Sequence, residues 1–104
     1  MPLYFIAETT TREGMISVDE APERAKGVVA FAASMGVEVI EFFFTLGPQD
    51  FIMKVHAPDD ETVAAFVLAV RRSGNVTAQV SRAFTPEEWS AIVARLPYSD
   101  DSNS

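Results

Sequence analysis

The chain has 104 residues, no cysteine and a formal net charge of −7 at neutral pH, which is typical of a single acidic domain. Without cysteine, a disulfide framework, a thiolate metal site and a cysteine nucleophile are excluded. The eight basic residues are scattered along the chain. Nucleic acid is therefore a poor partner, because phosphate binding needs clustered lysines and arginines.

The sequence predicts neither a membrane-spanning segment nor an export signal. No apolar run approaches the roughly 20 residues that a transmembrane helix needs. The first residues lack the basic segment that begins a signal peptide. We therefore expect a cytoplasmic protein with no membrane partner.

The first predicted elements are a strand and a helix. Residues 3–9 are apolar and rich in aromatic and β-branched side chains, which predicts a strand followed by a polar loop. Residues 17–20 are expected to form a short turn. Pro22 suits the first turn of a helix that begins near Ala21. Apolar residues recur at helical spacing up to Gly36, which suits the end of this helix.

A hairpin is predicted next. Residues 37–46 form its first strand and residues 51–56 its second, because both are runs of apolar and β-branched side chains. The Gly47-Pro48 dipeptide between the two runs is a turn signal.

A second helix and a fourth strand follow the hairpin. An acidic N-cap at Asp59 or Asp60 begins the helix, and the Ser-Gly-Asn segment at 73–75 ends it. Residues 76–84 alternate between apolar and polar side chains, which predicts a strand with two different faces.

The third predicted helix begins with a capping box. Thr85 suits the N-cap, Pro86 the first helical position and Glu88 the position that closes the box. Pro97 ends this helix, and residues 98–104 are expected to form a flexible acidic tail. A single domain therefore spans residues 1–97.

This order of elements predicts a ferredoxin-like α+β fold, βαββαβ, with an antiparallel sheet and an extra C-terminal helix. Right-handed crossovers place both long helices on one side of the sheet and leave the other side bare. Phe42, Phe43 and Phe44 follow one another, so both faces of that strand are apolar. Leaving such side chains in water costs about 1.5–3 kcal/mol each, and contiguous apolar patches usually mark interfaces. We therefore expect a homodimer, or a higher oligomer, that pairs through the bare sheet faces.

Four ordered stretches of the chain resemble the GYD-domain family: EFFFTLG at 41–47, APDD at 57–60, GNV at 74–76 and RAFT at 82–85. The naming motif of the family, Gly-x-Tyr-Asp, stands here as Gly47-Pro48-Gln49-Asp50, so that Gln49 replaces the tyrosine. The resemblance implies the dimeric α+β barrel assembly, in which two ferredoxin-like sheets enclose a space. It implies a fold more than an activity, because the broader group includes cofactor-free monooxygenases, haem-handling enzymes and isomerases.

Two residues are candidates for catalysis. His56, the only histidine, shares a strand face with Lys54. On an enclosed face the two could bind an anion or transfer a proton, whereas a strand-end histidine could equally be exposed to solvent. One histidine without a thiolate does not predict a metal site, and we predict no cofactor.

Five residues are candidates for ligand binding. Gln49 and Asp50 either line the rim of the enclosed space or belong to an ordinary turn, in which Asp50 accepts from local backbone N–H groups. The polar row Thr77, Gln79 and Ser81 either positions a small molecule or faces solvent.

The leading hypothesis is a small homo-oligomeric protein, of uncharacterised role, that binds a small ligand between paired sheets. The alternative is a cofactor-independent oxidase, monooxygenase or isomerase with His56, Lys54 and Gln79 as its acid/base and positioning groups. A third possibility is a purely structural assembly module. The sequence leaves open whether the protein is an enzyme.

Overall fold

A four-stranded antiparallel sheet is the centre of the fold. The computed structural model describes residues 1–97, and the predicted tail at 98–104 lies outside the described residues. The strands are ordered β2-β3-β1-β4. Their bounds are Leu3–Thr10 for β1, Glu38–Phe44 for β2, Phe51–His56 for β3 and Val76–Ala83 for β4. The ferredoxin-like α+β prediction is confirmed.

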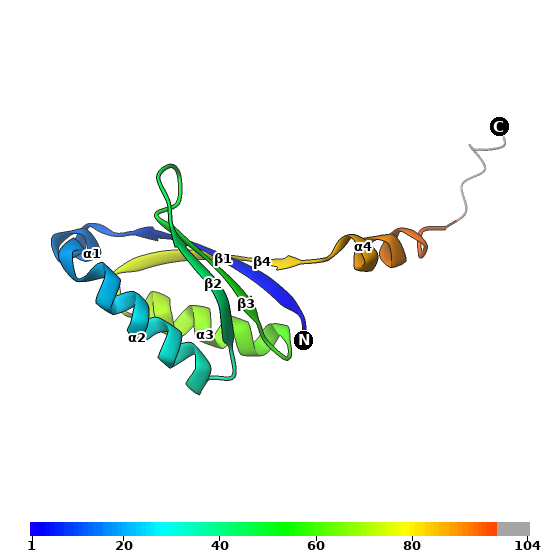
Figure 1. The fold of residues 1–104 in the computed structure, drawn as a ribbon, viewed down its shortest axis with the longest axis horizontal. Coiled ribbons are helices and arrows are strands. Elements are labelled where there is room, and N and C mark those ends of the chain that lie inside the picture. The colour runs from blue at the N-terminus through cyan, green and yellow to red at the C-terminus, as the bar shows by residue number, and fades with distance from the viewer. Residues whose placement is uncertain (98–104) are drawn as a thin grey trace.

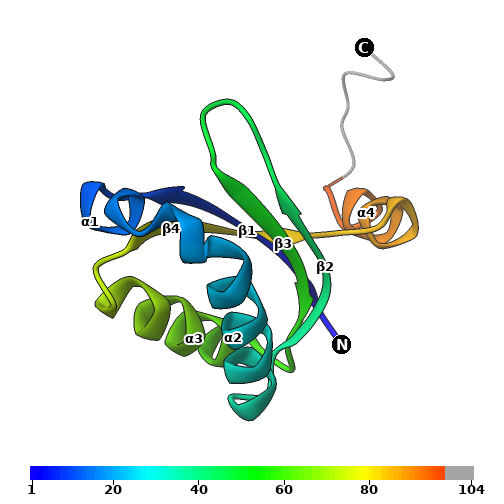
Figure 2. The same cartoon turned by 60° about the vertical axis from the view of Figure 1, so that its left-hand side comes forward.

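Two long helices, α2 (Ala21–Ser34) and α3 (Asp60–Arg72), cover one face of the sheet (Figures 1 and 2). The Asp59 side chain caps α3 by accepting from the backbone N–H of Thr62 at 2.8 Å. This contact lowers the pKa of the Asp59 carboxyl, because a hydrogen bond to the charged form favours that form.

The connection from β1 to α2 contains more structure than the sequence predicts. The expected turn before α2 is present as the 3-10 turn η1 (Val18–Glu20). The preceding segment, expected to be a loop, forms the short helix α1 (Arg12–Ile16). Its cap explains the difference, because the Thr11 hydroxyl accepts from the backbone N–H of Gly14 at 3.2 Å.

The hydrophobic core lies between the sheet and the helices α2 and α3. Alternation along β1 turns Tyr4, Ile6 and Glu8 toward the helices, and all three are buried. The buried apolar residues of the core are Tyr4, Ile6, Ala32, Val37, Met53, Val55, Ala57, Val63, Phe66 and Val67.

The other face of the sheet is not covered by the helices of the described chain (Figure 2). Phe43 on β2 is 57% exposed and Phe5 on β1 is 40% exposed. Phe42 lies on the opposite side of β2 and packs against the core. The expectation that β2 is apolar on both faces is therefore confirmed. We call this uncovered side the open face.

Helix α4 (Pro86–Val93) projects from the end of β4, away from the sheet and the other helices (Figures 1 and 2). Its predicted capping box is confirmed, with both reciprocal hydrogen bonds between Thr85 and Glu88 present. The Trp89 side chain packs on Phe84 but remains 55% exposed. The radius of gyration is 17.3 Å, whereas a compact domain of this length has about 13 Å. The projecting helix α4, which we call the arm, accounts for the larger radius of gyration.

No helix in the described part of the chain is long and apolar enough to span a membrane.

Candidate functional site

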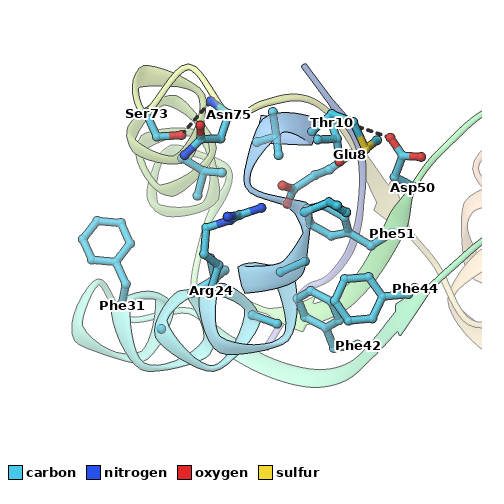
Figure 3. A pocket seen from close by; sticks show the side chains of 18 of the residues that line it. Glu8, Thr10, Arg24, Phe31, Phe42, Phe44, Asp50, Phe51, Ser73 and Asn75 are labelled. Atoms are coloured by element: carbon cyan, nitrogen blue, oxygen red, sulfur yellow. Dashed lines mark hydrogen bonds between the residues drawn. The ribbon is translucent and has the colours of Figure 1, made fainter. Parts of the chain in front are cut away.

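A cavity of about 620 Å³ lies on the helix-covered side of the sheet (Figure 3). Residues from all four strands and from α1, α2 and α3 line it. Small-molecule sites have volumes of about 300–1,000 Å³, so this cavity has room for a small organic ligand.

Aromatic side chains form one wall of the cavity. Phe42 and Phe51 stack with their ring planes 9° apart and their centroids 5.3 Å apart, and the ring centroid of Phe44 lies 5.3 Å from that of Phe42. The three rings share one face because Phe44 pairs with Phe51 across the hairpin and side chains alternate along each strand. Val28 and Phe31 of α2 also line the cavity. The space between the two layers therefore suits a flat, apolar molecule.

Glu8 is the polar exception among these walls. Its side chain points into the cavity from β1 (Figure 3) and is only 1% exposed. Its Oε2 atom has no hydrogen-bond partner, the single such buried side-chain atom among residues 1–97. Burial raises the pKa of the Glu8 carboxyl to about 7, because the charged form loses its hydration. The Glu8 carboxyl therefore keeps its proton to a higher pH than an exposed glutamate does.

Asp50 borders the cavity and also fixes the loop before β3. Its carboxylate accepts from the backbone N–H of Thr10 at 2.6 Å, and its own N–H donates to the Glu8 carbonyl at 2.8 Å. In the turn itself, Gly47 has a φ of +129°, which favours glycine. The Gln49 carbonyl accepts from the Thr45 hydroxyl at 2.7 Å, and Gln49 does not line the cavity.

Arg24 of α2 is the cation that lines the cavity (Figure 3). Its guanidinium donates to the Ser17 carbonyl at 2.9 Å and to the Ser17 hydroxyl at 3.0 Å. A longer bond of 3.4 Å reaches the Gly14 carbonyl. Arg24 therefore holds η1 and α1 against α2, and it forms no ion pair with Glu8 within the described structure.

The predicted catalytic residues Lys54 and His56 lie on the open face instead. Lys54 forms an ion pair with Glu41, with 3.5 Å between Nζ and Oε1. Nδ1 of His56 lies 3.7 Å from Oε1 of Glu38. The strand register therefore brings His56 and Lys54 to one face, as the sequence predicts, but neither lines the cavity.

The predicted polar row also lies on the open face. Across β1, Thr77 pairs with Thr9, Gln79 with Ala7 and Ser81 with Phe5. All three polar side chains are exposed and none lines the cavity. Of the seven predicted site residues, Asp50 alone lines the cavity. Gln49 lies in the turn between β2 and β3, and the other five lie on the open face, so that a functional role for these six stays a prediction. Within residues 1–97 no group of three or more metal-ligating side chains is present.

Sequence reasoning missed Glu8. The signal was present, because alternation puts Glu8 on the same face of β1 as the apolar Tyr4 and Ile6. A charged residue on a core-facing row is unusual and points to a special environment. The bare sheet face carries several apolar side chains. For this reason the sequence predicted the ligand site on that face and not on the face of Glu8.

Comparison with known proteins adds a family and two structural neighbours. A family model described as the GYD domain matches residues 4–93. The glutamine synthetase and cystathionine beta-lyase binding protein of Thermus thermophilus is 32% identical over 97 residues, which cover 92% of this chain and 99% of that protein.

Two solved structures are similar in fold. That of FFRP-DM1 has a TM-score of 0.60 and covers 81% of this chain and 100% of its own. That of TTHA0845 from Thermus thermophilus has a TM-score of 0.54 and covers 82% of this chain and 95% of its own. Both are 20% identical in sequence, so the likeness concerns the fold alone.

Proposed function

Since the chain belongs to the GYD-domain family, in which fold alone assigns no activity, we propose from its own cavity that it is a small-molecule-binding protein. The ligand occupies the space between the helices and the sheet of each protomer. The observation that carries this proposal is an aromatic-walled cavity of about 620 Å³ into which one buried carboxyl points without a protein partner.

The physical reason is that the cavity is apolar yet too large to be a packing defect. Protein interiors are close-packed, and voids larger than a water molecule are few. The cavity is open to solvent, and an apolar ligand that fills it removes its apolar walls from water. The exposed rims of Phe44 and Phe31 leave an entry from solvent.

Filling the cavity tests the proposal. The probe is N-phenyl-1-naphthylamine, an apolar fluorophore, titrated into the protein at neutral pH. We expect one molecule to bind per protomer, and Ala25→Trp to weaken binding at least tenfold, because Ala25 lines the cavity and the indole occupies it. The matched control is Ala30→Trp, an exposed position of the same helix outside the cavity, which should bind as the wild type does. Undiminished binding to Ala25→Trp, or no binding to the wild type, contradicts the proposal.

Self-association through the open face is the second part of the proposed function. The exposed Phe5 and Phe43 on that face support it, and so does the partly exposed Trp89 of α4. A homodimer of this kind places Lys54, His56 and the polar row between the two copies. Those residues then line the interface, where the sequence predicted a ligand space.

Binding to other enzymes is a second candidate function. The Thermus relative is named as a binding protein for glutamine synthetase and cystathionine beta-lyase. The feature of this chain that favours a protein partner is α4, whose apolar Trp89 and Val93 are exposed, as is Leu96 just beyond it. Co-sedimentation with purified glutamine synthetase, for the wild type and for Trp89→Ala, tests this candidate. If Trp89→Ala binds glutamine synthetase as well as the wild type does, α4 is not the binding surface.

A further inference from the structure

Glu8 is buried without the compensation that a buried carboxyl normally has. It is 1% exposed, and its Oε2 atom has no hydrogen-bond partner. A polar group taken out of water without a new hydrogen bond is unfavourable, which is why buried polar groups in native proteins are nearly always paired. Leucine or methionine at position 8 would avoid this penalty. Packing alone therefore does not explain a carboxyl at this position.

The other charged groups around the cavity do not supply that explanation. Arg24, from α2, is held by Ser17 and by the Gly14 carbonyl. Asp50, from the loop before β3, accepts from the backbone of Thr10. Both groups are engaged by the protein itself, whereas the Glu8 carboxyl borders the space that a ligand would fill and has an oxygen without a hydrogen-bond partner (Figure 3).

The walls specify the rest of the ligand. Phe42, Phe44 and Phe51 present an aromatic surface on the sheet side, and Phe31 and Val28 face the cavity from α2. Flat rings gain stacking and burial between such walls. The single unmet requirement inside is a hydrogen-bond donor for Glu8.

We propose, resting on the proposed function, that the cavity selects flat apolar molecules that carry an N–H or O–H donor, and that Glu8 accepts this hydrogen bond. The donor gives the Glu8 carboxyl a hydrogen-bond partner, and the ring of the ligand fills the space between the aromatic wall and α2. A molecule of the same shape without a donor keeps the burial but leaves Glu8 unsatisfied. Selectivity therefore comes from one atom pair rather than from shape.

Two probes that differ at a single nitrogen test the selection. Indole carries an N–H donor, and 1-methylindole has the same ring system without it. We expect the wild type to bind indole about tenfold more tightly than 1-methylindole, as measured by isothermal titration calorimetry at pH 7.5. Equal affinity for the two probes overturns the inference while leaving the cavity as a binding site.

Variants test whether Glu8 causes the preference for indole over 1-methylindole. Glu8→Met replaces the acceptor with an apolar side chain of similar length, and we expect the tenfold preference to disappear. Glu8→Gln keeps an acceptor oxygen and should keep a preference for indole. The control Glu23→Met removes an exposed acid of α2 that lies outside the cavity, so its preference should match the wild type.

The remaining outcomes are also decisive. A preference that survives in Glu8→Met means that another group accepts the donor, and the inference is wrong. If neither probe binds the wild type, the inference fails, and a simultaneous failure of N-phenyl-1-naphthylamine removes the proposed function with it. The comparison of the two probes on the wild type needs no variant. It therefore tests the inference even if the Glu8→Met protein does not fold.

Discussion

At the scale of single residues, Glu8 is the side chain whose environment most changes its chemistry. Desolvation raises its pKa in the folded protein to about 7, from an ordinary value of 4.5. Between these two values the folded protein keeps a proton that the unfolded chain releases. Stability attributable to Glu8 therefore falls as the pH rises through this window and levels off above the folded pKa. Arg24 and Asp50 are the other charged groups that line the cavity.

The first prediction compares unfolding of the wild type and of Glu8→Gln in urea between pH 5 and pH 8. Glutamine does not ionise, so the wild type should lose about 2–3 kcal/mol of unfolding free energy relative to the variant over this range. Glu23→Gln, at an exposed position, should show a constant offset from the wild type instead. A constant offset for Glu8→Gln as well means that the carboxyl is not desolvated in the folded state.

At the scale of elements, the junction between α1 and the turn that precedes β4 depends on close backbone contact. The N–H of Thr11 donates to the Asn75 carbonyl at 2.9 Å, and the Thr11 hydroxyl donates to the Gly74 carbonyl at 2.6 Å. Gly14 is buried against the same segment, and a Cβ atom there would overlap the Asn75 carbonyl and lie 2.8 Å from Cγ2 of Thr10. The position therefore needs glycine because of space.

Two glycines with opposite surroundings give the second prediction. Gly14→Ala should destabilise the protein by about 1–3 kcal/mol, because the methyl group forces α1 away from the Asn75 carbonyl in the turn before β4. Gly27→Ala, inside α2, should stabilise it by about 0.5–1 kcal/mol, because the added carbon would meet nothing within 4 Å besides the adjacent residues and backbone of its own helix, and alanine favours the helix. Urea unfolding measures both changes, and equal signs for the two substitutions would contradict these contacts.

At the scale of the whole molecule, the sheet is covered on one side only and α4 extends from its edge. The described residues reach 61 Å along the longest axis and 20 Å along the shortest, which is elongated for a domain of this length. Exposed aromatic side chains on the open face and on the arm are favoured surfaces for association. The proposed pairing accounts for both features with one partner.

The third prediction concerns this pairing, which sedimentation velocity at micromolar concentration measures. We expect the wild type to be a dimer or larger, and Phe43→Glu to raise the dissociation constant at least tenfold, because charge would be buried between the open faces. Leu68→Glu is the matched control, since Leu68 is 62% exposed but lies on α3, on the other side of the sheet. A wild type that sediments as a monomer contradicts the pairing.

The elements of this fold follow from short-range chemistry, and the order of the amino acids is enough to predict most of them. The capping box that begins at Thr85 and the cap at Asp59 act within four residues, so the chain places those helix starts locally. Alternation with a period of two puts Lys54 and His56 on one face whatever the sheet packs against. Helix α1 was not predicted because its cap at Thr11 works together with contacts to Gly74 and Asn75, over 60 residues away.

The cavity could not be predicted in this way. Its walls come from all four strands and from α1, α2 and α3, so its shape depends on how these elements pack together. The sequence alone identifies Glu8 as a charged residue in an apolar strand, but its raised pKa comes from desolvation by residues distant in the chain. Periodicity and caps are local and survive in any arrangement of the elements, whereas burial is a property of the arrangement itself.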